Sequence, residues 1–236
     1  MAVVWVTRTS DGAGRTAKAV EALGGTAIIA PVLAVQPIPA DIPADFDAII
    51  FTSRNGVEHF AAQNPRRPPA WCIGDATAEA AREHGFSPVI SAAGDARALF
   101  DTLKREANST TRFLYAAPRQ PSAPLADWMQ AENLTVTQAA VYEVAPVDPG
   151  LSDDDLDRIT HILIHSARAG RSVAHLLRAR HKFAFTNLCF ICISEQAWQG
   201  FAHAFGAELV QGIRRCIAAH PDEAAMLTLI GVDADS

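Results

Sequence analysis

Short apolar runs that end at a small hydroxyl residue or a glycine recur along this sequence, and segments with helical spacing of apolar residues follow them. Two stretches resemble each other: the runs at 48–53 and 71–74 in one, and the runs at 162–166 and 190–194 in the other. Wholly apolar strands that alternate with helices are typical of a parallel sheet buried on both faces. The pattern therefore predicts an α/β protein with two like domains that face each other across a cleft.

The same pattern predicts where individual strands and helices lie along the chain. We expect strands at 3–7, 26–32, 48–52, 70–73, 112–116, 136–140, 160–165, 188–193 and 207–210. We expect helices between Thr9 and Gly24 and near 54–62, 76–84, 95–107, 122–132, 168–180, 195–205 and 221–229. Asp153, Asp154 and Asp155 indicate a further helix start, because acidic residues are favourable in a first turn.

Two extended segments, 32–37 and 141–146, share their length, their apolar positions and a terminal proline. Matching linkers indicate that the chain crosses between two lobes twice. We therefore expect a discontinuous first lobe, an inserted second lobe and two linkers. Their predicted bounds are 1–34 with 147–236, then 38–140, and finally 32–38 with 141–147.

Composition limits the classes of function. The chain is 49% hydrophobic and 19% charged, which suits packed cores, and its net charge of −6 disfavours broad attraction to nucleic acid or an acidic membrane. Apolar runs fall short of the ~20 residues of a membrane span, and the first residues enter a strand directly, so we expect a soluble cytoplasmic protein. The eight histidines show no metal-ligand spacing, and the four cysteines are predicted to be buried thiols. Strand alternation would separate the Cys189–Cys192 pair onto opposite faces.

Small polar residues follow several predicted strands, at the edge where open α/β sheets bind ligands. Ser53 and Asn55 follow one strand, and the alternative for Ser53 is a simple helix N-cap. Gly74 and Thr77 repeat the arrangement after the next strand, with Ser166 and Ser194 as counterparts in the other lobe.

Two arginines and one tyrosine complete the candidate set. Arg8 and Arg119 also follow predicted strands, where they are plausible carboxylate partners or simply solvated side chains. Tyr142, on an extended linker that we expect to be exposed, either lends its phenol to a substrate or packs.

The segment 12–17 reads Gly-x-Gly-x-x-Ala between a predicted strand and a helix, as in a dinucleotide-binding turn. However, the strand at 26–32 ends without the acidic residue that would hold a ribose. A tight, anion-tolerant turn is the simpler interpretation.

Taken together, these pieces resemble the uroporphyrinogen-III synthase family over nearly the whole chain. The matching pieces, in family order, are Val6-Thr7-Arg8, Leu23-Gly24, Pro31, Pro37, the segments 47–57 and 72–78, Val141-Tyr142, Ser166 and Cys192-Ile193-Ser194. One segment departs from the pattern. Ser194-Glu195-Gln196-Ala197 stands where many relatives carry a Gly-x-x-Thr-like turn, which puts a ligand role for this turn in doubt.

The resemblance implies two three-layer α/β/α lobes of flavodoxin-like type with parallel sheets, joined by a two-strand linker ladder. It also implies a lyase of heme biosynthesis that uses no metal or organic cofactor. The enzyme would remove water from hydroxymethylbilane, invert the terminal ring and close uroporphyrinogen III. By this resemblance Tyr142 is the catalytic residue, assisting departure of the hydroxyl as water. The implied substrate-binding residues are Arg8, Ser53, Asn55, Gly74, Thr77, Arg119, Ser166 and Ser194.

Two alternatives remain open from the sequence. One is a non-enzymatic bilobal protein that binds an acidic metabolite or a tetrapyrrole. The other is a nucleotide-dependent enzyme that uses the segment 12–17. For the synthase we expect a monomer with a small-molecule substrate and no nucleic-acid or membrane partner, in transient contact with the preceding pathway enzyme.

Overall fold

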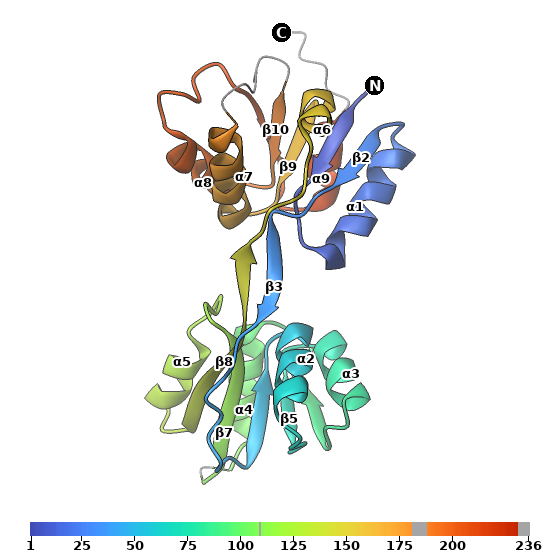
Figure 1. Ribbon diagram of the computed structural model, residues 1–236. Coiled ribbons are helices and arrows are strands. Elements are labelled where there is room, and N and C mark those ends of the chain that lie inside the picture. The colour runs from blue at the N-terminus through green and yellow to red at the C-terminus, as the bar shows by residue number, and fades with distance from the viewer. Residues whose placement is uncertain (109, 181–187, 231–236) are drawn as a thin grey trace. The chain divides into compact units, whose positions relative to one another are not determined.

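The computed structural model describes residues 1–108, 110–180 and 188–230 (Figure 1). The chain divides into two compact units. Unit 1 comprises Met1–Ala34 and Ala145–Ser236, and unit 2 comprises Val35–Val144. Within the described ranges, no helix combines the length and the apolar character that crossing a membrane requires.

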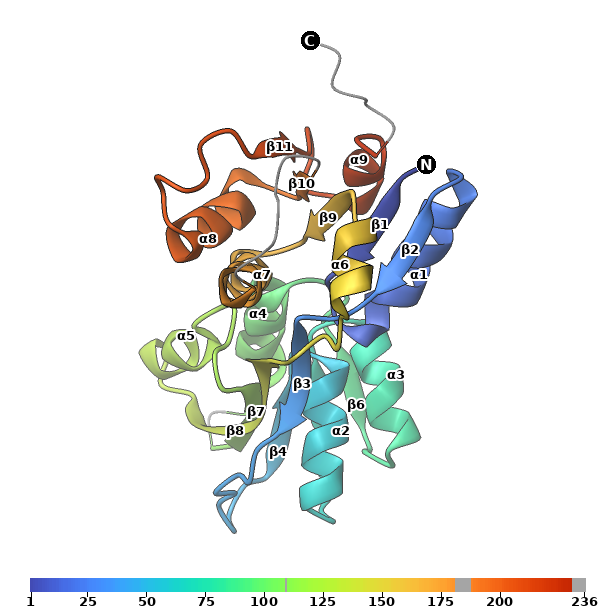
Figure 2. The ribbon, with the colours of Figure 1, turned by 45° about the horizontal axis from the view of Figure 1, so that its top comes forward.

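Unit 1 is built on a five-stranded sheet of the described residues, in the order β11-β10-β9-β1-β2, with every pairing parallel (Figure 2). Its strands are β1 (Val3–Val6), β2 (Thr26–Ile29), β9 (His161–Ile164), β10 (Cys189–Cys192) and β11 (Arg214–Ile217). Its helices are α1 (Ser10–Ala22), α6 (Asp153–Arg158), α7 (Ala167–Ala179), α8 (Glu195–Phe205) and α9 (Glu223–Leu227).

Unit 2 carries a six-stranded sheet in the order β3-β8-β7-β4-β5-β6, in which β4 to β8 pair in parallel. Its strands are β3 (Leu33–Pro37), β4 (Ala48–Phe51), β5 (Ala70–Cys72), β6 (Val89–Ser91), β7 (Arg112–Pro118) and β8 (Thr135–Pro146). Its helices are α2 (Arg54–Gln63), α3 (Asp75–Glu83), α4 (Ala96–Glu106) and α5 (Leu125–Ala131). The predicted α/β fold with two parallel sheets is confirmed.

Both faces of each central strand are buried, which explains why the sequence shows apolar runs rather than alternation. In β4, Ile49 and Phe51 pack with α2 and α3, whereas Ala48 and Ile50 pack with α4 and α5. Unit 2 therefore has three layers, with helices on both sides of its sheet (Figure 1). In unit 1, Ile191 packs with α1 and α9 on one face, and Phe190 contacts Trp198 and Phe201 of α8 on the other.

The two predicted linkers pair with each other, as the resemblance implied. β3 lies beside β8, and the Ile38 amide donates to the Val141 carbonyl at 3.1 Å. Six residues away on each segment, the Val147 amide donates to the Val32 carbonyl at 3.1 Å. These bonds satisfy backbone groups in the two segments through which the chain passes from one unit to the other.

The units share one spatial strand order although the chain runs through them differently. Matching β9, β10 and β11 with β4, β5 and β6 places β1 and β2 where unit 2 has β7 and β8. Unit 1 is thus a circular permutation of unit 2, and the strands that looked alike in sequence occupy equivalent positions.

Two local expectations were wrong, and one strand was missed. Residues 207–210 form turns instead of a strand; Leu209 is 62% exposed, and the edge strand β11 begins at Arg214. The strand β6 was not predicted. Gly12 and Gly14 lie inside α1, so the segment 12–17 is neither a dinucleotide-binding turn nor the tight turn that we expected as the simpler interpretation.

Candidate active site

In each unit the strand order reverses at one pair of neighbouring strands, and ligands of open α/β sheets bind outside the carboxyl ends there. The reversal lies between β4 and β7 in unit 2 and between β9 and β1 in unit 1. In unit 2 this edge carries Ser53 after β4 and Arg119 after β7. In unit 1, Ser166 follows β9 and Arg8 follows β1.

Ser53 joins a helix start to a buried tyrosine. As the N-cap of α2, its Oγ accepts a hydrogen bond from the Gly56 amide at 3.1 Å, so the N-cap interpretation is confirmed. The same Oγ lies 2.8 Å from the Tyr142 hydroxyl, which comes from β8. The expectation of an exposed Tyr142 is wrong: the residue is 6% exposed, and its ring lies 5.7 Å from that of His59.

Burial shifts the pKa of this tyrosine. Desolvation raises the pKa of the Tyr142 phenol, and the hydrogen bond with Ser53 only partly opposes that rise. Tyr142 is therefore protonated near neutral pH, as an ordinary phenol is, and its hydroxyl can donate a hydrogen bond. Tyr115 on β7 is similar, since burial raises its pKa and its hydroxyl lies 3.0 Å from Thr52 Oγ1.

The guanidinium of Arg119 lies at the same edge of unit 2. Its backbone amide donates to the Tyr142 carbonyl at 2.8 Å, which fixes the start of the loop after β7. Its Nε donates to Glu143 Oε2 at 2.6 Å. Because Glu143 follows Tyr142 directly, one short segment of β8 holds both the buried phenol and the partner of Arg119.

The other predicted residues of unit 2 differ in how much surface they offer. Asn55 is half-buried in the first turn of α2, and Gly74 is the N-cap of α3. Thr77 is 5% exposed, so its hydroxyl presents little surface to a ligand.

In unit 1, Arg8 follows β1 and its guanidinium lies over the start of α1. A Cβ atom at Gly12 would lie 2.3 Å from the guanidinium carbon of Arg8, so glycine at this position makes room for the arginine. Arg8 Nη1 donates to Glu223 Oε1 at 3.1 Å and to Thr16 Oγ1 at 3.4 Å. Thr16 Oγ1 also contacts Glu223 Oε1, so α1 and α9 meet at this arginine.

His165 follows β9 beside this cluster. Both of its ring nitrogens are buried, and neither has a hydrogen-bond partner among the described residues. Burial, with a smaller contribution from the Arg8 charge, lowers the pKa of His165 to about 4, while Glu223 acts in the opposite direction. The imidazole is therefore neutral near pH 7.

The two remaining serines are also N-caps. Ser166 Oγ accepts from the Ala169 amide at 3.1 Å, and Ser194 Oγ accepts from the Ala197 amide at 3.3 Å. Ser166 is exposed and Ser194 half-buried. In the segment that departs from the family pattern, the fourth position is the buried Ala197, which offers no hydroxyl.

No candidate metal centre emerges from the described residues, since they contain no group of three or more ligating side chains. The predicted burial of Cys72, Cys189 and Cys192 is confirmed, while Cys216 is half-buried. Burial raises the pKa of Cys72, Cys189 and Cys192 to about 12, so these thiols are poor nucleophiles.

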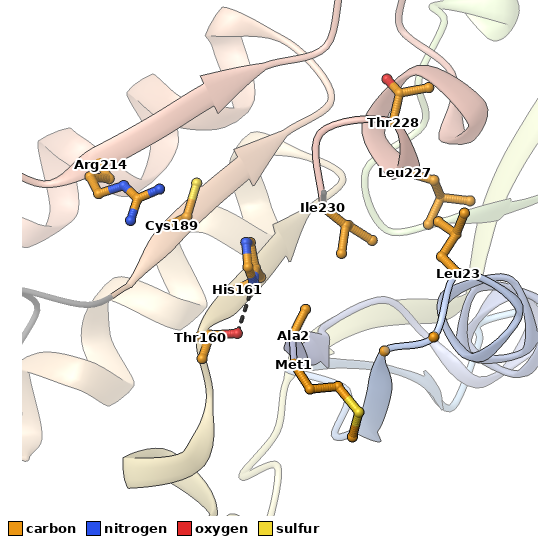
Figure 3. Close-up of a pocket in the computed structure, with 12 residues that line it drawn as sticks. Met1, Ala2, Leu23, Thr160, His161, Cys189, Arg214, Leu227, Thr228 and Ile230 are labelled. Atoms are coloured by element: carbon orange, nitrogen blue, oxygen red, sulfur yellow. Dashed lines mark hydrogen bonds between the residues drawn. The ribbon is translucent and has the colours of Figure 1, made fainter. Parts of the chain in front are cut away.

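A separate cavity of about 570 Å³ lies in unit 1 at the amino ends of its strands. Figure 3 shows Thr160, His161, Cys189 and Arg214 along one side and Leu23, Leu227 and Ile230 along the other. The Thr160 hydroxyl lies 2.8 Å from His161 Nδ1. The cavity is lined by none of the residues predicted for the site.

Sequence reasoning missed the two glutamates that contact the arginines. Glu143 directly follows Tyr142, a predicted site residue, so its place beside the candidate site could have been predicted from the sequence. Glu223 is 215 residues away from Arg8, and only the packing of α9 on α1 brings them together. His165 was noticed only as one of two histidines on a strand.

The fold and these two edges define a doubly wound α/β protein with two related units, each with polar side chains at the carboxyl ends of its sheet. The family model described as uroporphyrinogen-III synthase HemD matches residues 14–227, so the chain belongs to the uroporphyrinogen-III synthase family. The predicted family is confirmed, and so is the predicted class of enzyme, a cyclising hydro-lyase of heme biosynthesis.

Solved structures agree on the fold. Uroporphyrinogen-III synthetase from Helicobacter pylori aligns with a TM-score of 0.57 at 19% identity, covering 97% of each chain. A mutant uroporphyrinogen III synthase from Thermus thermophilus aligns with a TM-score of 0.50 at 13% identity, covering 97% of this chain and 96% of that one. A comparison with curated protein sequences gave no match.

Proposed function

We propose that this chain converts hydroxymethylbilane into uroporphyrinogen III, with the Ser53–Tyr142 hydroxyl pair promoting the loss of water. The observation that carries the proposal is the family match over residues 14–227. This match favours an enzyme over the non-enzymatic binding protein considered above. The reaction belongs to the family, and the roles below are our assignments to residues of this chain.

Loss of water requires a proton at the departing oxygen. The carbon–oxygen bond of the hydroxymethyl group breaks, the hydroxyl takes up a proton, and an azafulvene cation remains. Tyr142 supplies that proton, because its phenol is protonated near neutral pH and is hydrogen-bonded to Ser53. Ser53 is half-buried and lies 2.8 Å from the phenol oxygen, so its hydroxyl passes the proton from Tyr142 to the leaving group.

The remaining task is to hold a flexible polycarboxylate so that the correct pyrrole carbon attacks the cation. Fixing such a geometry is worth up to ~7–11 kcal/mol in favourable systems. Arg8 and Arg119 suit carboxylates, and the half-buried or exposed groups of Asn55, Gly74, Ser166 and Ser194 suit the polar parts of the substrate. Thr77 contributes through the first turn of α3, since its side chain is buried.

The test is an assay with freshly prepared hydroxymethylbilane. A catalyst yields the inverted isomer, whereas a protein that only binds leaves spontaneous closure to the non-inverted one. Tyr142→Phe should lower turnover several-fold with the fold intact, and Ser53→Ala should do the same. Combining the two should cost little more than either alone, because they act on one proton.

Tyr115→Phe is the matched control. Tyr115 is also a buried tyrosine, and its hydroxyl lies 3.0 Å from that of Thr52, the neighbour of Ser53. The substitution removes this contact. We expect Tyr115→Phe to keep near-normal turnover. Equal losses in the two tyrosine variants would remove the specific role of Tyr142, and an unchanged rate in Tyr142→Phe would do so directly.

We further propose that the chain acts as a cytoplasmic monomer that receives its substrate from the enzyme that makes it. The chemical reason is that hydroxymethylbilane closes spontaneously, so a short transfer limits loss to the non-inverted isomer. Sedimentation at assay concentration tests the monomer. Isomer ratios in a coupled assay, with and without an excess of the less active Tyr142→Phe protein, test the transfer.

A further inference from the structure

The two arginines assigned to substrate carboxylates are both already paired with a carboxylate of the chain. Arg8 Nη1 lies 3.1 Å from Glu223 Oε1 in unit 1, and Arg119 Nε lies 2.6 Å from Glu143 Oε2 in unit 2. Both arginines lie within two residues of the end of a strand that flanks the reversal of strand order. We propose that Glu143 and Glu223 are resident carboxylates that compete with the substrate for these arginines and so set its affinity.

The relation between the two units does not explain why an arginine–glutamate pair occurs in both of them. The arginines follow equivalent strands, since β1 matches β7 in the shared strand order. The glutamates do not come from equivalent elements, because Glu143 belongs to β8, whereas Glu223 is the first residue of α9. Two unrelated elements therefore supply the same group to arginines that follow equivalent strands.

The exposure of the pairs suits an exchangeable contact. The side chains of Arg8 and Glu223 are 28% and 30% exposed, and those of Arg119 and Glu143 are 55% and 33% exposed. Ion pairs in contact with water contribute little, so an incoming carboxylate displaces such a glutamate at a cost of about two- to fivefold in affinity. A guanidinium also has five N–H donors, which allows two-point binding of the replacement.

If the glutamates compete with the substrate, their substitution should change KM in one direction; if they only stabilise the fold, it should change KM in the other. This inference rests on the proposed function, because it takes Arg8 and Arg119 as substrate-binding residues. If each glutamate competes, Glu143→Gln and Glu223→Gln should each lower KM for hydroxymethylbilane by about two- to fivefold and leave kcat near normal. If the glutamates only hold the fold together, the same changes should lower Tm and raise KM.

Glutamine is the appropriate replacement because it keeps an oxygen at the same place. In Glu223→Gln the Oε1 that contacts Thr16 remains while the charge is lost. Glu132→Gln is the matched control. Glu132 pairs with Lys104 at 2.7 Å, and it lies between α5 and β8, at the amino edge of the sheet in unit 2. The control makes the same change in net charge at the opposite edge of the sheet from Arg119, and it should leave KM unchanged.

The experiment measures KM and kcat with hydroxymethylbilane, and the dissociation constant of uroporphyrin III, a polycarboxylate probe, by fluorescence titration. Both glutamine variants should bind the probe more tightly than wild type, and the gain from Glu223→Gln should vanish in an Arg8→Gln background. Unchanged or weaker binding in both variants overturns the proposal, and so does an equal gain in Glu132→Gln. Formation of the inverted isomer by the wild-type protein tests the proposed function separately.

Discussion

Gly56 lies in the first turn of α2, close to the backbone of β7. A Cβ atom at this position would lie 2.9 Å from the Ala116 carbonyl oxygen and 3.6 Å from Ser53 Oγ. Close carbon–oxygen contacts are about 3.3 Å or longer, so Gly56→Ala forces α2 and β7 apart by roughly 0.4 Å. Ala116 cannot yield easily, because it is 1% exposed and pairs with Phe51 in the sheet.

Two opposing effects set the size of the change. Overpacking of this kind costs about 1–3 kcal/mol, and the better helix propensity of alanine recovers about 0.5–1 kcal/mol. We expect Gly56→Ala to lower the free energy of unfolding of unit 2 by about 1–2 kcal/mol, which moves the urea midpoint down by about 1 M. Turnover should also fall several-fold, because the Gly56 amide holds Ser53 Oγ at 3.1 Å.

Gly14→Ala is the control that isolates the steric contact. Gly14 is exposed in α1, and a Cβ atom there would meet nothing within 4 Å. This variant should gain about 0.5–1 kcal/mol from helix propensity alone. The assay is urea unfolding followed by circular dichroism, with hydrogen exchange in α1 and α2 to assign each change to its unit. Shifts of the same sign in both variants would refute the steric argument.

Two further predictions concern unit 1. Gly200→Ala should destabilise more than Gly56→Ala, by about 3 kcal/mol, because its Cβ would lie 2.3 Å from the Ala167 carbonyl oxygen; urea midpoints compare the two directly. His165→Leu should flatten the dependence of stability on pH. The folded state lowers the pKa of His165 from 6.5 to about 4, so wild-type stability is complete above pH 6.5 and falls by up to about 3 kcal/mol as pH drops towards 4. Equal slopes for wild type and His165→Leu in urea unfolding between pH 7 and pH 4 would contradict this.

Much of the fold was predictable because buried parallel strands leave a clear pattern in the sequence. Runs such as Ala48–Phe51 are apolar throughout, since both faces are covered by helices. The serine N-caps were predictable for a local reason, because each serine hydroxyl accepts a hydrogen bond from the backbone amide only three residues later in the chain. The resemblance between two linkers also indicated, without any coordinates, that the chain crosses twice.

The errors arose where the burial of a segment does not follow from its own pattern of apolar and polar residues. Residues 207–210 contain Leu209 and Val210 and read as a strand, yet they form turns and Leu209 stays exposed. The edge strand β11 instead begins with Arg214 and Arg215, both exposed, because an edge strand needs little apolar surface. Likewise, the burial of Tyr142 depends on the packing of β8 against α2, which no periodicity within 141–146 encodes.

Because the two units are related by a circular permutation, the roles of their candidate site residues can be compared. Each unit places a serine and an arginine at the reversal of its strand order, so both can bind carboxylates by the same means. Only unit 2 adds a phenol, since the two tyrosines of the sequence, Tyr115 and Tyr142, both belong to it. In unit 1 the residue beside Ser166 is His165, whose lowered pKa leaves the imidazole neutral and a poor proton donor near pH 7. Under the proposed function, we therefore expect proton donation to the leaving hydroxyl from unit 2 and carboxylate binding from unit 1. Substitutions at Arg8 should accordingly raise KM, whereas those at Tyr142 should lower kcat.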